Sequence, residues 1–121
     1  MKILQIDDNP DIIKFVELTV SSMGHDFSSV NNGRDGLIMI DNNQYDLVLL
    51  DLSMPEFSGI DVINSLIENK KIQNQKIVIF TASSVSDNDL EDLKTKGVHS
   101  YMTKPIDIDS LMSKINEIEN S

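Results

Sequence analysis

One short stretch, from Leu47 to Pro55, constrains the fold of this chain more than any other. It opens with four consecutive apolar residues, too few for a buried helix and without the alternation of a half-exposed strand. It therefore predicts a strand covered on both faces. The run stops at Asp51, where a buried, unpaired carboxylate would be costly. Asp51 is thus either a solvated strand end or a group that meets a cation or a reacting molecule.

Composition narrows the class of protein. The 121 residues, 40% hydrophobic and 25% charged, suffice for one domain with one core, expected to span residues 1–121. The net charge of −10 argues against a surface for nucleic acid or anionic membranes, so proteins and cations are the expected partners. The lack of cysteine excludes disulfides and thiolate catalysis. Without a bilayer-spanning apolar run or a signal-peptide pattern, we expect a cytoplasmic protein.

Five apolar segments alternate with five helical patterns. The expected strands are residues 3–6, 25–30, 47–50, 76–80 and 98–102. The expected helices begin near capping residues, namely Asn9-Pro10, Asn32-Gly33, Ser58-Gly59, Ser86 and Asp107. This alternation predicts an α/β fold, with a parallel sheet between two helical layers. The strand order 2-1-3-4-5 would place the polar segment 25–30 at an edge.

Polar side chains follow four of these strands. Asp7 and Asp8 come after the first, Asp51 after the third, Thr81 after the fourth and Lys104 after the fifth. The carboxyl ends of parallel strands share one edge, and ligands bind there where the strand order reverses. We therefore expect these five side chains to converge near the first and third strands.

Three carboxylates in one crevice require a positive partner. Two like charges about 4 Å apart repel by roughly 4 kcal/mol at an effective dielectric of 20. Oxygen ligands without histidine or cysteine favour a hard ion, and Mg²⁺ fits best. With Lys104 as a fixed cation and Thr81 as a hydroxyl donor, the set describes a phosphoryl-transfer site in which a carboxylate attacks in line. Stabilisation of a helix N-terminus would account for one of the acids Asp7 and Asp8, but not for both.

In order and spacing these residues resemble the receiver domain of two-component response regulators, of the CheY-like, single-domain kind. The matching pieces extend over almost the whole chain: Asp7-Asp8, Asp51-Leu52-Ser53-Met54-Pro55 with Gly59, Thr81-Ala82, and Tyr101-Met102-Thr103-Lys104-Pro105. The resemblance implies a flavodoxin-like (βα)5 three-layer sandwich with five parallel strands in the order 2-1-3-4-5.

The resemblance also implies a role for each site residue. Asp51 would be the phospho-acceptor, forming an aspartyl phosphate. The implied Mg²⁺ ligands are the carboxylates of Asp7, Asp8 and Asp51 and the backbone carbonyl of Ser53. Lys104 would contact the phosphoryl oxygens.

Further implied roles concern switching. Thr81 would also contact the phosphoryl group, and Tyr101 would be the aromatic residue that moves with it. Pro105 would follow a cis peptide bond. Ser53 and Ser83 occupy positions that are associated in the family with phosphoryl lifetime.

The implied function is signal transduction in a two-component phosphorelay. A histidine kinase or phosphotransfer protein would phosphorylate the domain, with Mg²⁺ as cofactor. Phosphorylation would change its affinity for a protein target on the face formed by the fourth helix, fifth strand and last helix. The chain would not be an enzyme beyond catalysing its own phosphorylation and dephosphorylation, and it would contact no nucleic acid or membrane. It is either freestanding or a piece of a longer regulator.

Other classes share an acidic site on a similar sheet. Aspartyl phosphatases and phosphotransferases usually place a second acid two residues after the nucleophile and carry a cap, whereas Ser53 holds that position here. Flavin-binding electron carriers need a phosphate loop after the first strand, where Asp7 and Asp8 would repel the phosphate. A structural pseudo-receiver is the remaining alternative.

Overall fold

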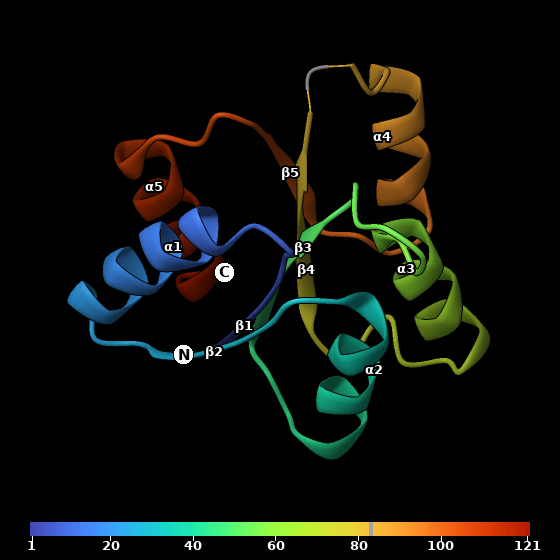
Figure 1. The fold of residues 1–121 in the computed structure, drawn as a ribbon, viewed down its shortest axis with the longest axis horizontal. Coiled ribbons are helices and arrows are strands. Elements are labelled where there is room, and N and C mark those ends of the chain that lie inside the picture. The colour runs from blue at the N-terminus through green and yellow to red at the C-terminus, as the bar shows by residue number, and fades with distance from the viewer. Residues whose placement is uncertain (83) are drawn as a thin grey trace.

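The computed structural model describes residues 1–82 and 84–121, in which five strands alternate with five helices (Figure 1). The strands are β1 (Lys2–Ile6), β2 (Asp26–Val30), β3 (Leu47–Asp51), β4 (Lys76–Thr81) and β5 (Ser100–Thr103). The helices are α1 (Pro10–Ser22), α2 (Gly33–Asn42), α3 (Gly59–Glu68), α4 (Asp87–Thr95) and α5 (Ile108–Glu119). Within the described ranges, no helix combines the length and apolarity needed to cross a membrane.

The strands form one parallel sheet in the order β2-β1-β3-β4-β5, which confirms the expected topology. Helices α1 and α5 cover one face, and α2, α3 and α4 cover the other (Figure 1). Alternate side chains of β3 enter the two resulting cores: Leu47 and Leu49 lie on the α1/α5 side, Val48 and Leu50 on the opposite side. The four apolar residues of β3 are buried, as their unbroken run predicts, and Asp51 at the end of the strand is buried as well rather than solvated.

Local capping signals fix where the helices begin. The Asn9 side chain accepts from the Asp11 N–H at 2.9 Å, which caps α1 just before Pro10. Asp107 caps α5 in the same way, accepting from the Ser110 N–H at 2.8 Å. Ser86 caps α4 by accepting from the Asp89 N–H at 3.2 Å. These caps hold the loops at the carboxyl edge of the sheet, where the polar residues lie.

Two sequence expectations need correction. Strand β5 begins at Ser100, two residues later than expected, because the Val98 N–H bonds back to the Leu93 carbonyl beyond the end of α4. For α3 the sequence spacing predicts an apolar stripe of Ile60, Ile63, Leu66 and Ile67. Of these, Ile60 and Ile67 are 38% and 36% exposed, while Val62, outside the predicted stripe, is fully buried. Ser83, at an expected lifetime position, lies outside the described residues.

Candidate functional site

Three carboxylates converge at the carboxyl ends of β1 and β3. These strands are neighbours, with Ile6 beside Leu50 in the register, so Asp7 and Asp51 end up side by side. Asp7 and Asp51 are buried and Asp8 is exposed. One carboxylate oxygen from each of the three lies within 4.8 Å of the others. The structure therefore brings together the acids that the sequence placed after these strands.

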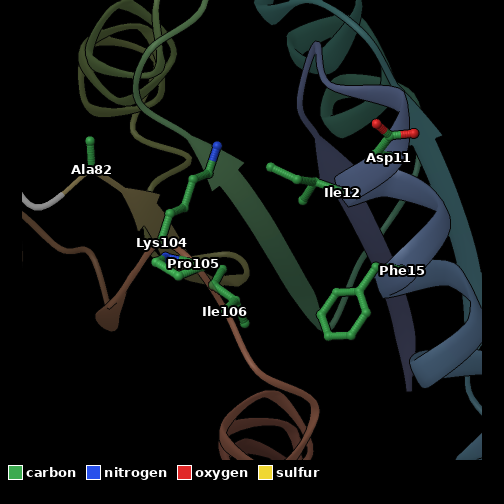
Figure 2. A pocket seen from close by; sticks show the side chains of 7 residues that line it. All are labelled: Asp11, Ile12, Phe15, Ala82, Lys104, Pro105 and Ile106. Carbon is green, nitrogen blue, oxygen red and sulfur yellow. The ribbon is translucent and has the colours of Figure 1, made fainter.

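Lys104 supplies the positive charge of the site. Its Nζ lies 3.3 Å from Asp51 Oδ1 and 3.6 Å from Asp7 Oδ2. The Lys104 N–H donates to the Thr81 carbonyl at 2.7 Å, which ties the residue to the end of β4. The peptide bond between Lys104 and Pro105 is cis, the isomer that the resemblance implies. Figure 2 shows the lysine side chain reaching toward the end of β3.

Backbone amides orient two of the carboxylates. Asp7 Oδ1 accepts from the Asn9 N–H at 2.9 Å, and Asp51 Oδ1 accepts from the Ser53 N–H at 3.1 Å. Asp7 Oδ2 is buried and has no hydrogen-bond partner among the described residues. One oxygen of Asp7 is thus held by the backbone, while the other has lone pairs available for a cation or a hydrogen-bond donor.

The electrostatics of Asp7 show why a cation suits the site. Burial raises the pKa of the Asp7 carboxyl, and repulsion from the charges of Asp51 and Asp8 raises this pKa further. The Asn9 N–H and the Lys104 ammonium act in the opposite direction without cancelling the rise. A divalent ion bound by the three carboxylates would relieve this repulsion. The oxygen-only donor set fits Mg²⁺, as expected from the sequence.

The two residues of the expected switch pair lie on adjacent strands. Thr81 ends β4 and is 1% exposed, and its hydroxyl donates to the Ala82 carbonyl at 3.2 Å. Tyr101 is half-buried in β5, beside Ile79 in the register, and packs against the core on the α2–α4 side. In this structure the Thr81 hydroxyl is therefore engaged by a neighbouring carbonyl.

A groove that the sequence did not reveal adjoins the site (Figure 2). It has a volume of about 500 Å³ and is lined by Asp11, Ile12 and Phe15 of α1 and by Ala82, Lys104, Pro105 and Ile106. Lys104 belongs to both the groove and the site, so a molecule in the groove comes close to Asp51.

Comparison with protein families decides what kind of domain this is. The family sequence model described as the response regulator receiver domain matches residues 3–116. The chain belongs to this family. This match confirms the resemblance seen in the sequence. Receiver domains of response regulators act in two-component phosphorelay signalling. Five strands in the order β2-β1-β3-β4-β5 with helices on both faces agree with the flavodoxin-like architecture.

Relatives support the assignment. The receiver domain is 32% identical to the response regulator ArlR of Staphylococcus saprophyticus over 114 residues, which cover 94% of this chain and 50% of that protein. It is 34% identical to the cell cycle transcriptional regulator CtrA of Caulobacter vibrioides over 118 residues, 98% of this chain and 50% of that protein. The chain thus spans about half the length of these relatives. Because CtrA is a transcriptional regulator, the expectation that the present domain contacts no nucleic acid stays a prediction.

Solved structures agree with the fold. The Francisella response regulator 1452 receiver domain superposes with a TM-score of 0.88 at 27% identity, covering 98% of this chain and 96% of that one. The response regulator TrrA of Thermotoga maritima, solved in complex with Mg²⁺-BeF, superposes with a TM-score of 0.79 at 28% identity, covering 97% of both chains.

Proposed function

We propose that this receiver domain accepts a phosphoryl group on Asp51 from a histidine kinase or phosphotransfer protein, in a Mg²⁺-dependent reaction. The observation that carries the proposal is the juxtaposition at the end of β3. Asp51 Oδ1 lies 3.3 Å from Lys104 Nζ, within a group of three carboxylates whose oxygens approach to within 4.8 Å. A nucleophile, a fixed cation and ligands for a metal thus occupy one site.

In the proposed reaction, an Asp51 carboxylate oxygen attacks the phosphorus of the donor's phosphohistidine. The phosphorus–nitrogen bond breaks, an aspartyl phosphate forms, and the leaving imidazole takes up a proton. Lys104 would neutralise charge on the phosphoryl oxygens, and the Thr81 hydroxyl would donate to one of them after leaving the Ala82 carbonyl. Mg²⁺, bound by Asp7, Asp8, Asp51 and the Ser53 carbonyl, would balance the remaining charge.

The proposal also includes the loss of the phosphoryl group by hydrolysis. Water would attack the phosphorus of the aspartyl phosphate, and Asp51 would leave as a carboxylate. The domain would then catalyse only its own phosphorylation and dephosphorylation, without acting as an enzyme on another substrate. The complex of TrrA with Mg²⁺-BeF supports the metal part of the proposal, since the present chain is 28% identical to that protein.

The partners follow from the surroundings of Asp51. The groove between α1 and Ile106 opens beside Lys104, and it offers the phosphodonor an apolar surface next to the nucleophile. A protein target would bind the face of α4, β5 and α5, which contains Tyr101. The net charge of −10 favours these protein contacts over nucleic acid or membrane. A cytoplasmic location is part of the proposal.

Intact-mass spectrometry tests this function. Incubation with phosphoramidate and Mg²⁺ should add one phosphoryl group to the wild type and none in excess EDTA. Asp51→Asn should remain unmodified, whereas Asp26→Asn, a change at an exposed acid at the opposite edge of the sheet, should react like the wild type. An unmodified wild type would favour the structural pseudo-receiver, and an adduct on Asp51→Asn would place the acceptor elsewhere.

A further inference from the structure

Gln5, in the middle of β1, has a buried amide that its surroundings do not satisfy. The side chain is 0% exposed, and neither Nε2 nor Oε1 has a hydrogen-bond partner among the described residues. Burying an amide without hydrogen-bond partners is unfavourable, because the group loses its hydrogen bonds to water. Methionine would fill the same space without this cost, so core packing alone does not explain a glutamine here.

The alternation of β1 shows which way Gln5 points. Ile3 belongs to the core under α1 and α5, whereas Leu4 and Ile6 belong to the opposite core. Gln5, two residues after Ile3, therefore points to the α1/α5 side. The same alternation places Asp7 on this side, because the Asp7 N–H still bonds to the Val30 carbonyl and continues the strand pairing.

Besides the two Gln5 atoms, one further buried side-chain atom of the described residues lacks a hydrogen bond, and it belongs to Asp7. In the described residues, the buried side-chain nitrogens and oxygens without a hydrogen bond are Gln5 Nε2, Gln5 Oε1 and Asp7 Oδ2. Asp7 Oδ1 is satisfied by the Asn9 N–H, and Lys104 Nζ lies 3.6 Å from Oδ2, beyond hydrogen-bond distance. An amide donor and a carboxylate acceptor thus stand unpaired on one face of one strand.

The amide can reach the carboxylate. Residues two apart on a strand are separated by roughly 6.6 Å, and strand side chains lean along the strand direction. The extended glutamine side chain covers most of this separation, so rotation about its own bonds suffices and the backbone stays in place.

We propose that Gln5 is a positioning residue of the metal site. Its Nε2–H donates to Asp7 Oδ2 when the carboxylates hold the divalent cation, and this bond fixes the orientation of the Asp7 carboxylate. A neutral donor holds the carboxylate without competing with the cation for negative charge. The inference rests on the proposed function, because it needs Mg²⁺ at the three carboxylates.

The test compares two matched variants by calorimetric titration with Mg²⁺. Gln5→Met keeps the length of the side chain and removes the donor, so the dissociation constant for Mg²⁺ should rise about tenfold or more. Its resistance to urea in EDTA should equal or exceed that of the wild type, because an unsatisfied amide is gone. Leu49→Met alters the residue beside Gln5 on β3, in the same core, and should leave Mg²⁺ affinity unchanged.

Equal Mg²⁺ affinity in wild type and Gln5→Met would overturn the inference, as would an equal loss in Leu49→Met. If Gln5→Met does not fold, the side-chain amide resonances of Gln5 in the wild type decide. They should shift on saturation with Mg²⁺, and unchanged resonances would overturn the inference. A wild type that binds no Mg²⁺ at all would overturn the metal part of the proposed function as well.

Discussion

Lys104 Nζ lies 3.3 Å from Asp51 Oδ1, although Asp51 ends β3 and Lys104 follows β5, and these two strands are not neighbours. Strand β4 separates β3 from β5 in the sheet, and the lysine side chain spans this gap above the end of β4. Lys104 also approaches Asp7, so one ammonium faces two buried carboxylates from different strands. This contact joins the third, first and fifth strands into one site.

Removing the Lys104 charge should destabilise the metal-free domain. Lys104→Met leaves the buried carboxylates of Asp7 and Asp51 without their cation, which should cost about 1–3 kcal/mol in the free energy of unfolding by urea. Lys114→Met is the matched control. Its side chain is 22% exposed, against 24% for Lys104, but its partner Glu117 is largely solvated at 60%. The control should lose less than about 1 kcal/mol, and equal losses would contradict the account.

Much of this arrangement could be predicted because its signals are local. The apolar run of β3, the Asn9-Pro10 start of α1 and the Asp107 cap each depend on neighbouring residues, and the structure confirms them. The strand order follows from alternation and from the polar character of β2. The convergence of Asp7, Asp8 and Asp51 then follows from the topology.

Features that depend on packing between elements could not be predicted. In α3, Val62 and Ile67 both fit a helical apolar pattern, and only the position of the sheet decides that Val62 is buried. Nothing in the sequence around Gln5 indicates that its amide is buried without a hydrogen-bond partner. The groove beside Lys104 needs the separation between α1 and the segment after β5, which no local pattern encodes.

The raised pKa of Asp7 predicts a pH dependence of the metal-free protein. Burial, the first cause, disfavours the charged form in the folded state, so between the unfolded pKa of 3.8 and the raised pKa the folded state binds more protons. The Asp7 contribution to stability therefore falls as pH rises through that window. Asp7→Asn removes the contribution. In EDTA, the stability of the variant relative to the wild type should therefore increase as pH rises above 3.8, and the difference should level off above the raised pKa. A difference between their urea midpoints that is constant with pH would contradict the cause given.

The end of α3 offers a test of backbone strain away from the site. Lys70 has a φ of 60°, a left-handed conformation that costs a residue with a Cβ free energy. Lys70→Gly should raise the free energy of unfolding by up to about 1 kcal/mol. Asn69→Gly, at a φ of −84°, should bring no gain, because asparagine is unstrained there. Equal changes in the two variants would show that the dihedral angle is not the reason.

The conformational effect of phosphorylation at Asp51 should pass through Thr81 to Tyr101. The Thr81 hydroxyl, now bonded to the Ala82 carbonyl, would turn toward the new oxygens, and Tyr101 would fill the space it leaves. With beryllofluoride and Mg²⁺, amide chemical shifts should change near Asp51, at Tyr101 and in α4. Thr81→Ala should confine the changes to the surroundings of Asp51. The same spread in this variant would mean that the coupling does not pass through Thr81.

The central claim is that Asp51 carries the phosphoryl group, and chemical mapping tests it most directly. Borohydride reduces an aspartyl phosphate to homoserine, which marks the modified position permanently. After treatment with phosphoramidate and Mg²⁺, peptide sequencing by mass spectrometry should find homoserine at position 51 and aspartate at positions 7 and 8. Homoserine at position 7 or 8, with aspartate intact at 51, would contradict the account.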